Sequence, residues 1–205
     1  MTTCNDTIKQ KLVASAAELS VFDGWSEKTL KSAATNEGIS YAKAKSLFPR
    51  GGIDLAKSFH QFGDQDFLTN FGKIDISRLS HSEKVAKALK IRFMVIAKNK
   101  EAFRRSMALF AMPMYHLEAI NLVWSTCDLI WVQIKGESFG ISWYTKRATL
   151  VSVYLSTLLF FLGDSSADHE DTECFIMRRL GDVSKLGQIK LDFVEFVKNM
   201  TVQNR

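Results

Sequence analysis

Apolar residues recur every three or four positions along most of the chain, which is the spacing of amphipathic α-helices. Serine stands where several of these patterns begin, and Ser80-His81-Ser82-Glu83 has the form of a capping box. Glycine or proline stands where most of them end. The pattern predicts an all-α protein, with helices before Gly24, over Ser26–Gly38, Ser40–Phe48, Gly52–Phe71, from Ser80, before Pro113, over His116–Lys135, over Ser142–Gly163, around Phe175–Val183 and after Gly187.

The first three predicted helices form one unit. They are short, and a glycine turn at Gly38 separates the second from the third, as in a helix-turn-helix. We therefore divide the chain into a helix-turn-helix-like unit (1–50), a helical ligand-binding bundle (51–187) and an amphipathic C-terminal helix (188–205).

The helix predicted over Ser142–Gly163 dominates the bundle. After a start rich in aromatic and cationic residues it carries no charge until Asp164, and large apolar side chains occupy most of its circumference, as in a buried core helix. A stripe of small residues would let another backbone approach: Thr145, Thr149, Ser152 and Ser156. The residues predicted to bind a partner, with core packing as the alternative, lie in its first turns: Trp143, Tyr144, Lys146 and Arg147.

Charge is unevenly distributed over the 205 residues. The net charge is +5, and residues 73–107 hold ten Lys or Arg against three acids. A cationic segment of this kind could contact an anionic membrane surface, an acidic partner or phosphates. It could equally be a helix face that is exposed to solvent.

The residues Ala33 to Ser40 resemble the N-terminal domain of TetR-type regulators. Residues 1–60 contain eight basic and six acidic side chains, a weak excess for a protein that binds DNA phosphates. Lys43 and Lys45 are the residues of the third helix that would contact DNA. A TetR-type transcriptional regulator with a hydrophobic ligand pocket is the alternative function, although we do not expect DNA to be the partner.

No catalytic constellation is visible: phosphate-binding glycine loops, a nucleophile elbow and zinc-spaced histidines are absent, so we predict neither an enzyme nor a metal site. Three cysteines without framework spacing fit a reducing compartment, and the first residues resemble neither a secretory signal nor a mitochondrial presequence. We expect a cytoplasmic bacterial protein.

Aromatic and methionine residues concentrate around positions 93–162, as in a pocket for an apolar ligand or in a plain core. The predicted pocket residues are Met107, Phe110, Trp131, Tyr154 and Leu158. The last predicted helix has one apolar face, which could dock on its own domain, a partner or a membrane. The residues predicted to contact a membrane are Phe193, Phe196, Val197 and Met200.

Several motifs together resemble the Coq-nine family of ubiquinone-biosynthesis accessory proteins, a lipid-binding relative of the TetR fold. Their order and spacing span the chain from about Trp25 to Val183. The loop before Trp143 departs from the family, which usually has an aspartate-containing Ser-Thr-Asp stretch there. The matching pieces are Leu47-Phe48-Pro49, Gly51-Gly52, Asp54-Leu55, Ala108 to Pro113, Asp128-x-x-Trp131, Trp143 to Arg147, Asp164-Ser165-Ser166 and Thr172-x-x-Phe175-x-x-Arg178-Arg179.

The resemblance implies a TetR-like homodimer that is not an enzyme and has a reduced or lost DNA function. It implies that the protein binds an isoprenoid or phospholipid, needs no cofactor, and presents quinone intermediates to the demethoxyubiquinone hydroxylase. It also implies association with a membrane through the C-terminal helix, which for a bacterial protein is the inner face of the membrane.

Overall fold

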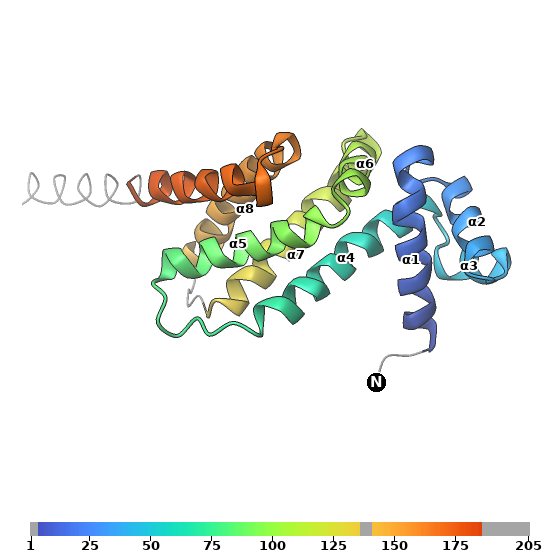
Figure 1. Ribbon diagram of the computed structural model, residues 1–205, viewed down its shortest axis with the longest axis horizontal. Helices are drawn as coiled ribbons and strands as arrows, with labels where there is room; N and C mark the ends of the chain where they lie inside the picture. The colour runs from blue at the N-terminus through green and yellow to red at the C-terminus, as the bar shows by residue number, and fades with distance from the viewer. Residues whose placement is uncertain (1–3, 136–140, 186–205) are drawn as a thin grey trace, which may run out of the picture.

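The computed structural model describes residues 4–135 and 141–185, without the side chains of residues 141–143. This part of the chain contains helices and no strand, as predicted. A further helix without a label in Figure 1 covers residues 170–185. The labelled elements are α1 (Cys4–Asp23), α2 (Glu27–Asn36), α3 (Tyr41–Leu47), α4 (Gly52–Phe71), α5 (His81–Ala97), α6 (Lys100–Phe110), η1 (Pro113–Tyr115), α7 (His116–Gln133), α8 (Ile141–Gly163) and η2 (Ala167–His169).

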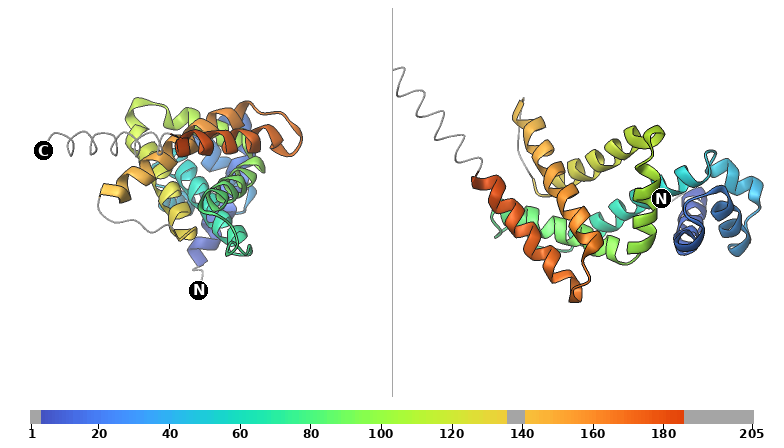
Figure 2. Two further views of the ribbon diagram at one scale, coloured as in Figure 1. Left: turned by 90° about the vertical axis from the view of Figure 1, so that its left-hand side faces the viewer. Right: turned by 90° about the horizontal axis from the view of Figure 1, so that it is seen from above.

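The helices α1 to α3 lie together at one end of the molecule, and α4 leads from them into the bundle (Figures 1 and 2). The predicted N-caps of this unit are confirmed: the Ser26 hydroxyl accepts from the amide of Thr29 at 3.2 Å, and that of Ser40 from Lys43 at 3.3 Å. Each bond satisfies an amide that the first turn of a helix leaves without a partner. The serine pattern therefore determines where α2 and α3 begin.

Gly51 and Gly52 allow the start of α4 to lie very close to the start of α2. Gly51 has φ +64°, and a Cβ on Gly52 would lie 2.2 Å from the carbonyl oxygen of Trp25, where no side chain fits. The Trp25 indole donates to the Ala102 carbonyl at 2.9 Å and so attaches the N-terminal unit to α6. The apolar cluster of this unit extends accordingly into the bundle helices, with Ala102, Phe110 and Leu122 as members.

The bundle has its own apolar cluster, built mainly from α4, α5, α7 and α8. The capping box at its entrance is confirmed: the Glu83 amide donates to the Ser80 hydroxyl at 3.4 Å, and the Ser80 amide to the Glu83 carboxylate at 2.8 Å. The rings of Phe93 and Tyr154 stack at 5.5 Å between α5 and α8. These contacts place the bundle core beside α8.

Only one side of α8 is buried. Leu150, Tyr154 and Phe161 are buried, whereas Leu155 is 37% and Leu159 73% exposed. The prediction of a buried core helix is therefore correct for one side of α8 only, because Leu155 and Leu159 on the other side are exposed. Among the described residues α8 is the one helix long and apolar enough to cross a membrane, by length and composition alone, and a protein core helix passes the same test.

The turn after α8 is built around one buried carboxylate. Asp164 accepts from the amide and hydroxyl of Ser166 at 2.8 and 2.6 Å, and from those of Thr172 at 3.0 and 2.5 Å. Burial alone would raise the pKa of Asp164, but these hydrogen bonds outweigh it and hold the pKa below its usual value. The acidic turn thus positions the helix over residues 170–185.

Candidate functional site

A cavity of about 460 Å³ lies where α5, α7, α8 and the helix over residues 170–185 meet. Its volume is within the range of small-molecule sites, about 300–1,000 Å³. Apolar and small polar side chains from all four helices form its wall. The lining residues are His81, Ser82, Val85, Trp131, Lys135, Thr145, Lys146, Thr149, Leu150, Val153, Leu180, Val183 and Ser184.

The polar groups of this cavity are the ammonium groups of Lys135 and Lys146, the imidazole of His81 and several hydroxyls, with no carboxylate among the described lining residues. The Lys146 ammonium lies 5.8 Å from the centre of the Trp131 ring, and the His81 ring contacts the same indole edge-on at 5.2 Å. Burial, with Lys146 and Lys84 nearby, lowers the pKa of His81. The cavity therefore combines an apolar interior with two lysines at its rim, an arrangement suited to an apolar molecule that carries a polar or anionic head.

The structure does not bring the five predicted pocket residues together. Trp131 lines the cavity, but Tyr154 and Leu158 are buried in the bundle core. Met107 packs against that core, and Phe110 belongs to the N-terminal cluster.

The pocket prediction missed Val85, Leu150, Val153, Leu180 and Val183. The helical spacing shows that these residues face inward, but it cannot show which inward face remains unfilled.

The residues of the predicted partner cluster have different environments. Tyr144 is 64% exposed and Lys146 is exposed beside the cavity. Arg147 is buried, and its Nε donates to Asp128 of α7 at 2.5 Å. Trp143 lies in α8, outside the residues whose side chains the structure describes. The predicted membrane residues lie outside the described residues: Phe193, Phe196, Val197 and Met200.

The outer side of α8 forms an uncharged, exposed strip, which we call the α8 strip. It consists of Ala148, Ser152, Leu155 and Leu159, spaced by three or four residues. Two exposed leucines beside two small residues suit packing of a second helix.

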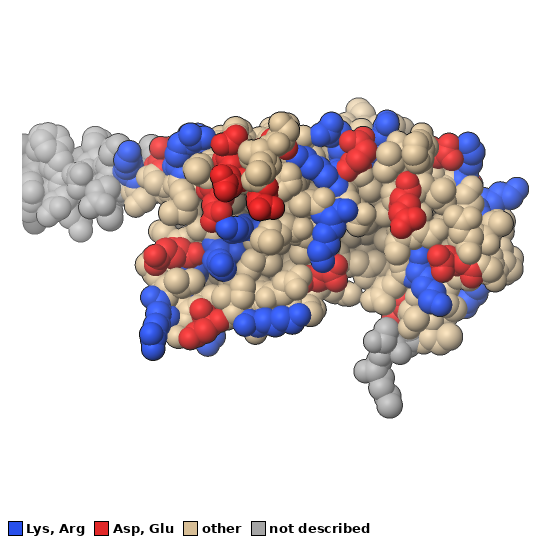
Figure 3. Space-filling model, in the orientation of Figure 1, with Lys and Arg blue, Asp and Glu red and all other residues tan. Residues whose placement is uncertain are grey.

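The two lysines of α3 are engaged within the N-terminal unit. Lys45 contacts both carboxylate oxygens of Glu27 at 2.8 Å, and Lys43 donates to Asn5 at 2.9 Å. The Tyr41 hydroxyl also donates to Glu27. Acidic and basic side chains are interspersed over the face of the molecule in Figure 3, including this unit. An acid of α2 that pairs with Lys45 of α3 opposes the phosphate contacts that a DNA-binding helix needs.

Comparison with known sequences relates the chain to one family. Residues 117–187 match the COQ9 family. The ubiquinone biosynthesis protein COQ9, mitochondrial, of Rattus norvegicus is 25% identical over 191 residues, which cover 89% of this chain and 60% of that protein. The probable ubiquinone biosynthesis protein coq9, mitochondrial, of Dictyostelium discoideum is 28% identical over 180 residues, 85% of this chain and 59% of that protein. The chain thus spans about three fifths of the length of these relatives.

Comparison with solved structures confirms the fold. The TetR transcriptional regulator from Nitrosomonas europaea ATCC 19718 superposes with a TM-score of 0.73 and 19% identity, over 87% of this chain and 99% of that chain. The predicted all-α, TetR-like fold is correct. The family match, the relatives and this fold together confirm the resemblance of the chain to the COQ9 family, the Coq-nine family that its sequence motifs indicate.

Proposed function

We propose that the protein is a non-enzymatic, lipid-binding accessory protein of ubiquinone biosynthesis, which presents quinone intermediates at a membrane to the demethoxyubiquinone hydroxylase. The role in ubiquinone biosynthesis rests on the names of the relatives. The observation that carries the lipid part is the cavity of about 460 Å³ beside the exposed start of α8.

Lipid binding is supported by the composition of the cavity wall. Val85, Leu150 and Val153 offer apolar surface to a chain that water excludes. Lys135 and Lys146 lie at the rim, where they would attract a phosphate or a polar quinone head. We therefore expect an isoprenoid or phospholipid to bind with its head at the lysines, and no cofactor to be required.

A non-catalytic role agrees with the chemistry of the same wall. His81 is the one described lining residue that could act as a general base near neutral pH, and no lining carboxylate orients it. Acid–base catalysis usually requires at least a positioned pair of groups. The cavity is equipped to hold a molecule rather than to transform it.

Presentation to an enzyme requires a docking surface next to the cavity. Tyr144 is exposed one residue before Thr145, which lines the cavity, and Lys146 lies on the same rim. We propose that these residues, together with Trp143, contact the hydroxylase. The buried Arg147 then supports this surface from below instead of touching the partner.

A homodimer would cover the α8 strip. Leu155 and Leu159 otherwise remain in contact with water, whereas two copies of the strip could pack around Ala148 and Ser152.

Membrane contact through the C-terminal helix remains a sequence-based proposal, and we place the protein peripherally on the membrane that carries the ubiquinone pathway. The names of the relatives describe those proteins as mitochondrial, while the sequence prediction for this chain is the inner face of a bacterial membrane.

The proposal is tested by native mass spectrometry of the purified protein, with extraction and identification of co-purifying lipid. We expect a quinone, isoprenoid or phospholipid bound in a defined ratio to the protein. Thr149→Trp fills the cavity from α8 and should reduce lipid occupancy by about tenfold. Thr69→Trp is the matched control, because Thr69 is exposed on α4 and, like Thr149, donates its hydroxyl to the carbonyl four residues earlier.

Equal lipid occupancy in the two variants would exclude this cavity as the binding site. A lipid-free wild-type protein that also ignores liposomes would reject lipid presentation as a whole. The TetR-type regulator, favoured only by the fold similarity, would then become the leading function.

A further inference from the structure

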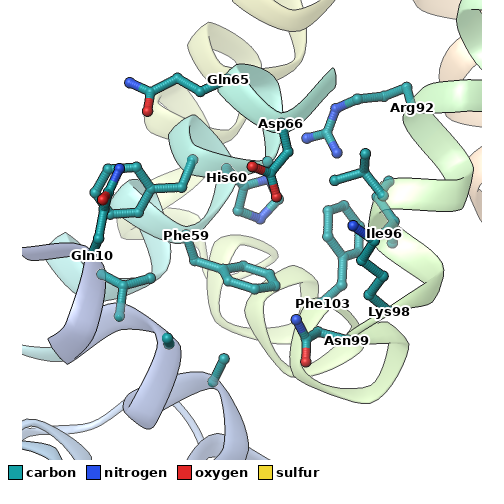
Figure 4. A pocket seen from close by; sticks show the side chains of 16 residues that line it. Gln10, Phe59, His60, Gln65, Asp66, Arg92, Ile96, Lys98, Asn99 and Phe103 are labelled. Carbon is teal, nitrogen blue, oxygen red and sulfur yellow. The ribbon is translucent and has the colours of Figure 1, made fainter. Parts of the chain in front are cut away.

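A second cavity lies at the junction between the N-terminal unit and the bundle, and it shares no lining residue with the lipid cavity. We call it the junction cavity. Its volume is about 340 Å³, and side chains from α1, α4, α5 and α6 line it (Figure 4). Its walls are partly aromatic, with Phe59, Phe62, His60 and Phe103 among the lining residues.

A buried guanidinium points into this cavity (Figure 4). Arg92 is 1% exposed, and its Nε donates to Asp64 at 3.0 Å. Within the described part of the chain its Nη2 is buried and has no hydrogen-bond partner. Buried polar groups in proteins are nearly always hydrogen-bonded, so an orphaned arginine nitrogen beside a cavity indicates a missing acceptor.

Asp64 is not that acceptor in this structure, because Nη2 of Arg92 makes no hydrogen bond to it. Oδ1 of Asp64 accepts from Nε of Arg92, and both of its oxygens contact the hydroxyl of Thr126, each at 3.0 Å. The end of the guanidinium lies against Gly63, where an added Cβ would stand 3.2 and 3.3 Å from Nη1 and Nη2. Because Gly63 has no side chain, the two end nitrogens of Arg92 have room beside the cavity.

The neighbouring histidine contributes an uncharged ring. The Ser106 hydroxyl donates to the Phe103 carbonyl at 2.7 Å, so the 2.8 Å bond between Ser106 and His60 has Nε2 of His60 as its donor. Burial, and Arg92 nearby, lower the pKa of His60 to about 3, which keeps the ring neutral. Its centroid lies 4.6 Å from that of Phe103, and Phe59 lies 6.5 Å from Phe103.

The end nitrogens of Arg92, and not an excess of positive charge, determine which acceptor fits. Arg92 and Lys98 are the cations that line the cavity, and Asp66 is the one carboxylate among its described lining residues. Asp64 binds the Nε of Arg92 and leaves Nη2 without an acceptor. A carboxylate is the group that matches the two end nitrogens of a guanidinium, since it can accept from both at once.

We propose that the junction cavity binds a small aromatic carboxylate, with its ring near Phe59 and Phe103 and its carboxylate on the end nitrogens of Arg92. Such a ligand supplies the missing acceptor and places an aromatic ring among aromatic walls. It would contact α1 through Val13 and the bundle through Arg92, so it would bridge the two parts of the protein. This site is independent of the proposed lipid function.

The test is calorimetric titration of the full chain with benzoate. We expect saturable binding with one site per chain. Benzyl alcohol, which has the ring without the charge, and acetate, which has the charge without the ring, should each bind about tenfold more weakly or worse. Acetate binding as tightly as benzoate would overturn the aromatic assignment, and equal binding of benzyl alcohol would overturn the carboxylate assignment.

Two variants locate the site. Arg92→Met should weaken benzoate binding by about tenfold or more, provided that circular dichroism shows a folded protein. Ala14→Phe tests the site without altering the core, because Ala14 is exposed and lines the cavity from α1. It should weaken binding similarly, whereas Ala42→Phe at an exposed position of α3 should not.

Unchanged binding in Ala14→Phe, or no saturable binding by the wild-type protein, would overturn the proposal whatever happens to Arg92→Met. Thr149→Trp, which fills the lipid cavity, should leave benzoate binding unchanged. Failure of the lipid function and failure of the junction cavity are thereby distinguished.

Discussion

Arg147 of α8 donates from Nε to the Asp128 carboxylate of α7 at 2.5 Å, and its side chain is only 6% exposed while that of Asp128 is 39% exposed. The bond joins the start of α8 to α7, beside the wall of the proposed lipid cavity, to which Trp131 and Lys146 contribute. Both residues belong to the sequence motifs that resemble the family. The two neighbouring cations at this helix start therefore have different tasks, Arg147 in packing and Lys146 at the surface.

Arg147→Met should lower the free energy of unfolding by about 2 kcal/mol, because the charge-assisted bond to Asp128 is lost. Lys146→Met is the matched control at the exposed neighbour and should change stability by less than about 0.5 kcal/mol. Urea unfolding monitored by circular dichroism measures both. Equal losses in the two variants would show that the bond to Asp128 does not stabilise the α7–α8 contact.

Asp164→Asn should destabilise the protein by about 2 kcal/mol, since the amide cannot accept all four hydrogen bonds from Ser166 and Thr172. Asp171→Asn, at an exposed position in the following turn, is the control and should have little effect. Thermal unfolding of the two variants gives the comparison. A smaller effect at Asp164 than at Asp171 would contradict the role of this carboxylate in holding the helix over residues 170–185.

Stability should fall as the pH decreases from 7 to 5 because of His60. The folded pKa of about 3 lies below the unfolded value of 6.5, so in this window the unfolded chain binds a proton that the folded protein does not. The loss is about 1.4 kcal/mol per pH unit once the pH is below 6.5, or about 2 kcal/mol at pH 5.

His60→Gln should remove that part of the pH dependence, since glutamine does not titrate. Urea unfolding at pH 7 and pH 5 for both proteins isolates the contribution of His60, because His81 and the other histidines are common to them. An unchanged pH dependence in the variant would mean that His60 is already accessible to protons in the folded state.

The α8 strip predicts an oligomeric state that one substitution should alter. Leu159→Glu places a charge at its most exposed leucine and should convert a dimer into a monomer, as measured by sedimentation velocity. Leu117→Glu is the control on α7, where the leucine is 64% exposed but lies outside the strip. A wild-type monomer, or a dimer that survives Leu159→Glu, would contradict the proposed interface.

DNA binding should be weak, because Glu27 binds Lys45 at the surface of α3. We expect no affinity for duplex DNA that depends steeply on salt, and no loss of affinity in the double variant Lys43→Ala/Lys45→Ala. Fluorescence anisotropy at two salt concentrations tests this. Tight duplex binding that high salt and the double variant both abolish would support the regulator function instead.

Local features of the chain determined its elements. Ser26, Ser40 and the pair Ser80 and Glu83 mark helix starts, because their side chains accept hydrogen bonds from backbone amides only three residues away. Apolar spacing likewise identified the buried side of α5, whereas at the start of α7 the regularly spaced apolar residues Leu117 and Ile120 are exposed. These interactions join residues that are close in sequence, so the pattern of residues alone predicts them. The family motifs extended this to the TetR-like fold.

The sites depended on contacts that are distant in sequence. Arg147 resembles Lys146 in the sequence, yet Asp128 lies beside it only when α7 and α8 pack together. The proposed lipid cavity is bordered by four helices. Whether the inward face of a helix is packed or lines a cavity depends on how all four helices pack together.

The sequence by itself thus determined the helices, their order and the family resemblance, because periodicity and capping act within a few residues. Only the tertiary structure decided which charges are buried, where the α8 strip lies exposed, and that Arg92 has an end nitrogen without a partner beside a cavity. The physical reason is that burial and hydrogen-bond satisfaction are properties of packed neighbours, and packing joins residues that the chain separates by tens of positions.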